Sequence, residues 1–367
     1  MVTLIFLFTA FHVGFNLYLL IGWRKIAISE PYQSDVSISV IVPVRNEEDV
    51  IAKILSCLAF QEYPKDQFEV IVVNDFSEDH TLKEIQKCLT KLAINIKVIS
   101  LSEKKETGKK HAITKGVKEA RYNYILTTDA DCQMGPLWLA SYANHFKISK
   151  FIAGPVALKG DGLFASLQQV EFAGLMGFGA VTMEQNNPSM CSGANLGFSK
   201  EAFEEVGGYA DNIQIPSGDD EFLLYHILKR YPGKAKFLKN KAAIVLTSTH
   251  DAIGGFINQR KRWTSKWKYH RNWKLRMMAI LFFMDYLSLL GIFFAVGWGM
   301  LVPIVAAVLI MFRIISDYGF IYSVNRFLGF RKTLLPVLLL QIIYPLHVLF
   351  MGVNSIFGKY TWKGRKY

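Results

Sequence analysis

The feature that most constrains the fold is the uneven placement of charged residues along the chain. Three long stretches contain no Asp, Glu, Lys or Arg: 1–23, 286–312 and 333–358. Each is long enough to cross a bilayer, because a spanning helix needs about 20 apolar residues. The part from about residue 30 to residue 276 reads as an ordinary soluble sequence. The chain is therefore predicted to be an integral membrane protein with a water-soluble domain between membrane segments.

Residues 1–23 are expected to form a transmembrane helix rather than a cleaved signal peptide. No positive charge precedes the apolar run, and no small-residue cleavage site follows it. Arg24 and Lys25 follow directly, so the positive-inside rule places the next domain in the cytoplasm, at a plasma or inner membrane. The four cysteines, Cys57, Cys88, Cys132 and Cys191, are widely scattered and include no C-x-x-C pair, which argues against a zinc site or a disulfide framework. Reduced thiols fit a cytoplasmic domain.

Two or three further membrane segments are expected at 277–358. Residues 277–317 are long enough for two crossings with a turn near 297–303. Residues 333–358 form another segment, interrupted by Pro336 and Pro345, which either crosses or re-enters. The basic tail at 359–367 favours the cytoplasm, which would require an even number of crossings after the first span.

The stretch 257–276 combines positive charge with aromatic residues. It holds eight Lys or Arg residues and no acid in a chain whose formal charge is +12, with Trp263, Trp267, Tyr269 and Trp273 interleaved. Such mixtures can bind single-stranded nucleic acid. Because this one ends against a hydrophobic segment, we interpret it as an interfacial helix on an anionic membrane surface and expect no nucleic-acid partner. A merely solvated face would leave the tryptophans unexplained.

Apolar strands alternate with helical stretches at the start of the soluble domain, which we place at 30–256. The predicted strands are 37–42, 70–73, 96–101 and 124–128, and the predicted helices are 48–60, 81–92 and 111–120. This alternation indicates an α/β fold with a mostly parallel sheet and helices on both faces. In such sheets ligands bind beyond the carboxyl ends of the strands.

Charged residues follow the first two predicted strands. Pro43 and the charged residues Arg45 and Glu47 come after the first strand, and Asp75 comes after the second. Charges at this edge could contact a nucleotide, and Asp75 could accept a hydrogen bond from a base N–H. Helix capping explains the same residues about equally well, because acids and short polar side chains favour helix N-termini.

The most informative motif is the pair Asp129 and Asp131 directly after the fourth predicted strand. Two carboxylates one residue apart repel each other unless a cation or a hydrogen-bond donor lies between them. Their oxygens suit Mg²⁺ or Mn²⁺, with a diphosphate completing the coordination shell. An Asp-x-Asp tripeptide also occurs in turns and calcium loops. The prediction of a metal site therefore depends on the position of this one directly after a strand.

Two further motifs lie in the second half of the soluble part. Asp219 and Asp220 belong to a run of three acids before an apolar helix, where they could form a plain helix N-terminus or supply a general base. Gln259, Arg262 and Trp263 lie three and four residues apart, hence on one helix face. That face offers an arginine fork for a diphosphate and an indole for stacking on a sugar.

Taken in order, these elements resemble the family 2 glycosyltransferases, the group that holds cellulose, hyaluronan and chitin synthases and ceramide glucosyltransferases. The resemblance covers roughly residues 37–265. It implies a GT-A, Rossmann-like catalytic domain, a nucleotide-sugar donor, a UDP-sugar above all, and a divalent cation, Mg²⁺ or Mn²⁺.

The resemblance also implies a role for each motif by position. Asp220 is the implied general base, although the local sequence Ser-Gly-Asp-Asp leaves Asp219 as an alternative. Asp131 and Asp129 are implied to hold the metal. The implied acceptor-binding residues are Trp263, Asn195 and Asp219. The implied donor-binding residues are Pro43, Arg45, Glu47, Asp75, Asp129, Gln259, Arg262 and, within a G-K-x-x-A stretch, Lys109.

The expected reaction is a single displacement with inversion at the sugar carbon, since one base and no clear protein nucleophile is found. At most three C-terminal membrane segments favour a lipid or lipid-linked glycan as acceptor, with a processive polysaccharide synthase as the alternative. A catalytically inactive membrane scaffold is a more distant alternative. A nucleotidyltransferase is disfavoured, because residues 43–48 lack the glycines of a phosphate loop.

Overall fold

The computed structural model describes residues 1–31, 35–103, 106–215, 217–266, 273–330 and 332–357, and the main chain at 361–362 and 365–366. The chain forms two compact units. The first, here called the helical unit, comprises 1–25, 160–177 and 249–367. The second, here called the sheet unit, comprises 26–159 and 178–248. Each is described by itself.

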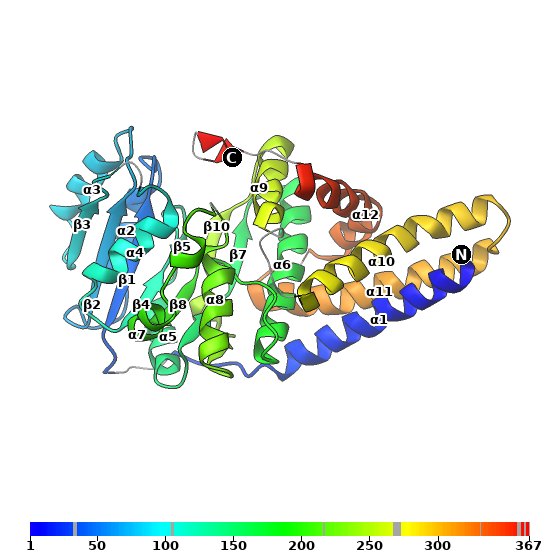
Figure 1. Cartoon of the computed structure of the whole chain (residues 1–367), viewed down its shortest axis with the longest axis horizontal. Coiled ribbons are helices and arrows are strands. Elements are labelled where there is room, and N and C mark those ends of the chain that lie inside the picture. The colour runs from blue at the N-terminus through cyan, green and yellow to red at the C-terminus, as the bar shows by residue number, and fades with distance from the viewer. Residues whose placement is uncertain are drawn as a thin grey trace. The chain divides into compact units, whose positions relative to one another are not determined.

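A seven-stranded sheet forms the centre of the sheet unit (Figure 1). Its first four strands in spatial order, β3, β2, β1 and β4, are parallel. Strand β8 then runs antiparallel to both β4 and β6, and β9 pairs parallel with β6. The predicted α/β fold with a mostly parallel sheet is thereby confirmed. In spatial order the strands are β3 (Ile96–Ser100), β2 (Phe68–Asn74), β1 (Ile38–Val44), β4 (Tyr124–Thr127), β8 (Leu196–Ser199), β6 (Phe151–Ala153) and β9 (Ala235–Phe237).

Amphipathic helices cover this sheet. Helix α2 (Ile51–Ala59) buries Ile51, Ile54, Leu55 and Leu58, the spacing of a single helix face. Helix α4 (Lys109–Glu119) approaches β1 closely, because a Cβ atom on Gly116 would lie 2.6 Å from the side chain of Ile41. The other helices are α3 (Thr81–Leu89), α5 (Trp138–Phe146), α7 (Lys200–Glu205), α8 (Asp219–Arg230) and the 3-10 turns Ala210–Asn212 and Lys241–Ala243.

A second sheet of three strands completes this unit, in the order β5 (Gln133–Met134), β10 (Val245–Ser248) and β7 (Val156–Lys159). Strand β10 is antiparallel to β5 and parallel to β7. Because β5 starts just after the Asp129–Asp131 motif, this sheet brings β10 next to the end of β4.

Long apolar helices dominate the helical unit. Among the described residues, four helices are long and apolar enough to cross a membrane: α1 (Val2–Lys25), α10 (Trp273–Gly297), α11 (Pro303–Leu328) and α12 (Leu334–Phe357). The last is one helix that contains Pro345. The unit also holds α9 (Ile253–Ser265), the first part of α6 (Leu163–Glu184) and a short pair of strands, β11 (Thr361–Trp362) and β12 (Arg365–Lys366). Of the expected interfacial stretch, Trp267 and Tyr269 lie outside the described residues, as do the side chains of the basic tail.

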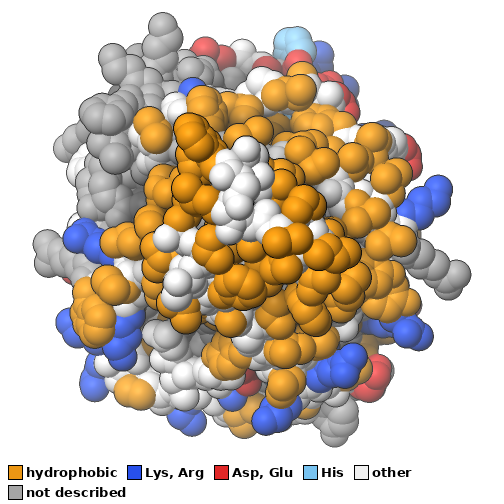
Figure 2. All heavy atoms as spheres, turned by 90° about the vertical axis from the view of Figure 1, so that its right-hand side faces the viewer, with side chains coloured by type: hydrophobic (Ala, Val, Ile, Leu, Met, Phe, Trp, Pro, Cys, Tyr) orange, Lys and Arg blue, Asp and Glu red, His pale blue; other side chains and the backbone are white. Residues whose placement is uncertain are grey.

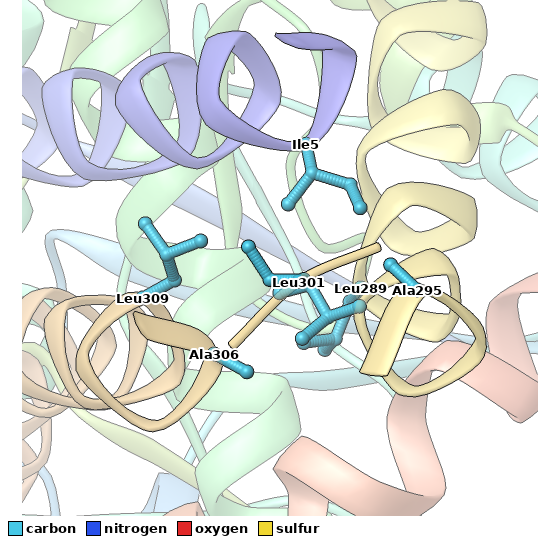
Figure 3. Close-up of a cluster of buried hydrophobic side chains, with 7 residues drawn as sticks. Ile5, Leu289, Ala295, Leu301, Ala306 and Leu309 are labelled. Carbon is cyan, nitrogen blue, oxygen red and sulfur yellow. The ribbon is translucent and has the colours of Figure 1, made fainter. Parts of the chain in front are cut away.

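Helices α1, α10 and α11 run side by side (Figure 1). Ile5 of α1, Leu289 of α10 and Leu309 of α11 meet in a buried apolar cluster (Figure 3). Large apolar side chains also point outward, as Trp298 (68% exposed) and Ile304 (69% exposed) do, and hydrophobic side chains cover much of the face seen in Figure 2. A surface this apolar is unusual for a soluble protein and fits contact with lipid.

Candidate active site

Two strands leave the sheet through strained residues at its carboxyl edge. Asn46 follows β1 and Phe76 follows β2, and each has a φ of 53°, which is unusual for residues other than glycine. The two loops are tied together, because the side-chain oxygen of Asn46 accepts a hydrogen bond from the Glu78 N–H at 2.9 Å. Such strain persists only where the surroundings fix the backbone, and it is frequent at binding sites.

Arg45 and Asp75 build this edge of the site. The guanidinium of Arg45 donates hydrogen bonds to the backbone carbonyls of Asp75 at 2.8 Å and Phe76 at 3.1 Å. The Asp75 side chain is buried and accepts a hydrogen bond from the N–H of Gly108 at 3.0 Å. Gly108 has a φ of 111° and directly precedes α4, so Asp75 fixes the start of the helix that carries Lys109.

The loop after β1 is fixed by the start of α3. The N–H of Glu47 donates to the Thr81 hydroxyl at 2.7 Å, and Pro43, half-buried in β1, lies opposite Val73 of β2. Asp79 accepts hydrogen bonds from the N–H and the hydroxyl of Thr81 at 3.0 and 2.6 Å. Burial alone would raise the pKa of Asp79, but these hydrogen bonds lower it. Asp79 thus holds the first residue of α3, whereas His80 at the N-cap position makes no side-chain cap hydrogen bond.

Lys109 forms the centre of the site. Its ammonium lies 2.8 Å from a carboxylate oxygen of Asp129, at the end of β4, and 3.0 Å from one of Asp219, at the start of α8. It also donates to the carbonyl of Gly193 at 3.3 Å. Residues far apart in the sequence thus converge on one cation, which separates the two carboxylates.

The electrostatics of this cluster follow from burial and from the ion pairs. Burial alone would lower the pKa of Lys109, but Asp129 and Asp219 raise it well above its usual range. Burial alone would raise the pKa of Asp219, but Lys109 lowers it. Asp129 behaves differently: burial and the carboxylates of Asp131 and Asp219 outweigh Lys109, and its pKa is raised.

Asp220 faces a different set of partners from Asp219. One of its oxygens accepts a hydrogen bond from the N–H of Gly193 at 3.0 Å, and the other accepts from the N–H of Glu221 at 2.8 Å. A Cβ atom on Gly193 would lie 2.7 Å from Asp219 and 2.8 Å from Lys109, so this position has no room for a side chain. The Gly193 peptide therefore joins the two acids, with its carbonyl toward Lys109 and its N–H toward Asp220.

Asp131 is the exposed member of the acidic pair. Its carboxylate accepts a hydrogen bond from the Thr247 hydroxyl of β10 at 3.3 Å. Within the described part of the chain, no group of three His, Cys, Asp or Glu side chains could hold a metal ion. Asp131 and the neighbouring Asp129 still fit a hard divalent cation, because Mg²⁺ is usually bound by one or two carboxylates together with substrate phosphates.

Asn195 is buried behind the site, which differs from its predicted role in contacting the acceptor. Its side chain is 0% exposed. Its amide oxygen accepts from the Trp138 indole at 2.9 Å and the Tyr142 hydroxyl at 2.7 Å, and its nitrogen donates to two backbone carbonyls at 2.8 and 2.9 Å. With all its hydrogen-bonding groups satisfied, Asn195 positions the segment that carries Gly193.

The third motif, on α9, belongs to the helical unit and is built around Arg260, which the predicted motif does not include. Arg260 is 4% exposed and pairs with Glu171 of α6, with its Nη2 2.5 Å from Oε2. Its guanidinium also donates to the side-chain oxygen of Gln259 at 2.5 Å and lies 4.2 Å from the ring centre of Trp263. The signal for this pair was the single acidic residue, Glu171, in the apolar first part of α6. Arg262 lies on the same helix.

Comparison with known proteins assigns the chain to a family. The model of Glycosyl transferase family 2 matches residues 39–207, and that of Glycosyl transferase family group 2 matches residues 124–325. The poly-beta-1,6-N-acetyl-D-glucosamine synthase of Staphylococcus epidermidis is 23% identical over 334 residues, 86% of this chain and 76% of that protein.

Two further similarities differ in extent, one to a short part of the chain and one to nearly all of it. The poly(ribitol-phosphate) beta-N-acetylglucosaminyltransferase TarS of Staphylococcus aureus is 41% identical over 93 residues, 25% of this chain and 16% of that protein. The structure of the mannosyltransferase PcManGT from Pyrobaculum calidifontis in complex with GDP-Man and Mn²⁺ aligns with a TM-score of 0.60 at 18% identity. That alignment covers 93% of this chain and 98% of the other. This likeness shows that the sheet unit has a GT-A-like fold.

Proposed function

Because the chain belongs to the family 2 glycosyltransferases, we propose that it transfers a sugar from a nucleotide-sugar to a membrane-associated acceptor, with inversion at the anomeric carbon. A UDP-sugar is the proposed donor, and a lipid or lipid-linked glycan is the proposed acceptor. The observation that carries the proposal is the convergence of Lys109, Asp129 and Asp219 beside Asp220 at the carboxyl edge of a parallel sheet.

Asp220 is the proposed general base. Its carboxylate takes the proton from the acceptor hydroxyl as that oxygen forms a bond to the anomeric carbon. The bond from this carbon to the donor phosphate oxygen breaks at the same time, and the nucleoside diphosphate leaves with the electron pair. Hydrogen bonds from the N–H groups of Gly193 and Glu221 support this role, because they fix the orientation of the carboxylate. A single displacement without a covalent intermediate inverts the sugar carbon.

Lys109 and the acidic pair are proposed to serve the diphosphate. Once a donor is bound, the Lys109 ammonium can exchange a carboxylate partner for a phosphate oxygen, since it is already desolvated and charged. Asp131 and Asp129 would hold Mg²⁺ or Mn²⁺, which would supply positive charge to the leaving diphosphate. The Mn²⁺ in the structurally similar mannosyltransferase supports a divalent ion here.

The remaining motif residues are proposed to bind the two substrates. Pro43, Arg45, Glu47 and Asp75 would contact the nucleoside of the donor. Gln259 and Arg262 would contact the diphosphate, and Trp263 would line the entrance for the acceptor. The basic residues in the last turn of α1, Arg24 and Lys25, support a cytoplasmic sheet unit, because positive charge accumulates on that side of membranes.

A processive polysaccharide synthase is the second candidate. It is favoured by the match to a poly-beta-1,6-N-acetyl-D-glucosamine synthase over 86% of this chain. The two functions differ in product length: a lipid glycosyltransferase yields a lipid with one or a few sugars, whereas a synthase yields a polymer.

The test uses the full chain purified in lipid nanodiscs with a lipid extract. UDP-GlcNAc, UDP-glucose and GDP-mannose are supplied in turn with Mn²⁺ or Mg²⁺, and both nucleoside diphosphate release and product mass are measured. The proposal predicts a UDP-sugar-dependent lipid product of increased mass that Asp220→Asn protein does not form. Long polymer would instead establish the synthase. No release from any donor would leave the inactive scaffold as the better account.

A further inference from the structure

A buried polar network lies inside the helical unit, and the proposed chemistry does not use it. Near the middle of the apolar helices, His12 of α1, Asp285 of α10, and Arg313 and Asp317 of α11 lie within hydrogen-bonding distance of one another. Asp285 and Arg313 are 0% exposed, and His12 is 5% exposed. Charged side chains are costly inside a membrane, so when they occur there they usually have a function.

The contacts of this network are close and specific. Arg313 donates to both oxygens of Asp285, at 2.8 and 2.9 Å. His12 bridges the two acids, with its Nδ1 2.8 Å from Asp285 and its Nε2 3.0 Å from Asp317. Asp317 also accepts hydrogen bonds from the amides of Asn16 of α1, at 2.8 Å, and Gln341 of α12, at 2.5 Å. All four apolar helices therefore contribute to it.

Counting donors shows that the network holds an extra proton. A neutral imidazole has one N–H and one lone pair, whereas an ionised carboxylate can only accept. Both ring nitrogens of His12 face carboxylate oxygens, so with both acids ionised the two contacts are hydrogen bonds only if the ring carries two protons. The other partners of both acids are hydrogen-bond donors. Arg313 donates to both oxygens of Asp285, which keeps that carboxylate ionised, and the amides of Asn16 and Gln341 donate to the two oxygens of Asp317.

The charge balance leads to the same result. Asp285 and Asp317 carry two negative charges and Arg313 carries one positive charge, which leaves one negative charge uncompensated. A protonated His12 makes the network neutral. The neighbouring titratable groups do not supply that charge, because Tyr286 of α10 and Tyr344 of α12, whose rings lie 5.4 Å apart, are neutral when protonated.

We propose that this network is a proton-binding site in which a doubly protonated His12, held between Asp285 and Asp317, fastens α1 to α10 and α11. Loss of the proton would leave a lone pair facing a carboxylate and an unpaired charge in an apolar interior, a costly arrangement. The attachment of α1 then depends on pH. The inference concerns the membrane helices and does not rest on the proposed transferase activity.

The Asp317→Asn substitution separates this proposal from a purely structural network. In this variant the remaining pair, Asp285 and Arg313, is neutral, and the introduced amide can donate to an unprotonated His12 nitrogen. The variant should therefore keep the hydrogen bond to His12 without the extra proton, provided that the Asn16 amide, which donates to the same position, turns its oxygen toward the introduced N–H. His347→Gln, on α12 but outside the contacts described for His12, is the control.

Nitrogen NMR of the full chain in nanodiscs, with ¹⁵N-labelled histidine, measures the protonation directly, and the His12 signals are identified by their loss in His12→Gln protein. At pH 7.5, where an ordinary imidazole is mostly neutral, we expect two protonated nitrogens in the native chain and in His347→Gln. We expect one in Asp317→Asn. A neutral His12 ring in the native chain, or the same protonation in Asp317→Asn, overturns the proposal.

Hydrogen exchange of α1, followed by mass spectrometry, tests the attachment. After correction for the intrinsic pH dependence of exchange, α1 should exchange at least about tenfold faster at pH 10 than at pH 7 in the native chain. In Asp317→Asn protein the two rates should be similar. Equal pH dependence in both proteins contradicts the proposed role of the proton. If His12→Gln does not fold, the His12 signals cannot be assigned by their loss. The proposal is then tested by the exchange rates of the native chain and Asp317→Asn protein, and by the native spectrum, in which the signals of one imidazolium must persist at pH 7.5.

Discussion

Replacing Lys109 by methionine tests whether its ammonium holds the carboxylate cluster together. The substitution keeps the length of the side chain but removes the partner of Asp129 and Asp219, at 2.8 and 3.0 Å. Breaking a buried ion pair costs about 3–5 kcal/mol, because the remaining charge is left without compensation. Since the Asp129 side chain is 37% exposed, water recovers part of that loss, and we expect a cost of about 2–3 kcal/mol.

Hydrogen exchange of the β4 amides, followed by mass spectrometry, measures this cost in the sheet unit itself. A loss of this size accelerates exchange roughly 30- to 150-fold. Lys115→Met is the matched control on the same helix, because Lys115 is 44% exposed and lies 3.4 Å from Glu119; its loss should cost less than about 0.5 kcal/mol.

The loss of stability caused by Lys109→Met should depend on pH in one direction. Lys109 more than offsets the effect of burial and holds the pKa of Asp219 below its usual value. The stabilisation by Asp219 is therefore present above about pH 4 and is lost as the pH falls further. The difference between the native chain and Lys109→Met should be largest near neutral pH and shrink in acid. If Lys109→Met and Lys115→Met exchange alike at pH 7, the ion pairs are screened by solvent and the reasoning fails.

Three further substitutions address other parts of the structure. Asn195→Ala should lower the free energy of unfolding in urea by about 2–4 kcal/mol, because four buried hydrogen bonds are lost; a change under 1 kcal/mol, a size typical of neutral surface changes, would contradict this. Asp131→Ala should weaken Mn²⁺-dependent donor binding in calorimetry about tenfold or more, and equal affinity would remove it from the metal site. Glu171→Gln should cost about 3–5 kcal/mol by leaving the Arg260 charge buried, and a double-mutant cycle with Arg260→Gln should show strong coupling rather than additive losses.

The sequence predicts the first half of the sheet unit well, because its signals are local. Strands β1, β2 and β4 each contain an apolar run that polar residues follow, and parallel strands bring their carboxyl ends to one edge. The convergence of Lys109 with Asp129 was not predicted, since no local pattern reveals that a helix N-terminus and a strand end meet. The side-chain role of Asn195 depends on tertiary contacts for the same reason.

In the helical unit, the sequence predicts the helices but not the polar contacts between them. Hydrophobic stretches predict membrane helices, yet they draw attention away from the few charges between them. Asp285 directly precedes the charge-free stretch 286–312 and Asp317 ends the predicted segment 277–317, whereas the structure places Asp285 within α10 and Asp317 within α11. Buried ion pairs among membrane helices form between distant segments, so hydropathy alone cannot pair them.

Transfer by Asp220→Asn protein, measured beside donor binding in the same preparation, tests the central claim most directly. The substitution keeps the shape of the side chain and removes the group that accepts the proton. Transfer should fall roughly 10²- to 10⁴-fold, while donor affinity stays close to that of the native chain. Asp219→Asn should instead weaken donor binding, because it disturbs Lys109. Near-native transfer by Asp220→Asn, or a loss explained entirely by donor affinity, would contradict the assignment of Asp220 as the base.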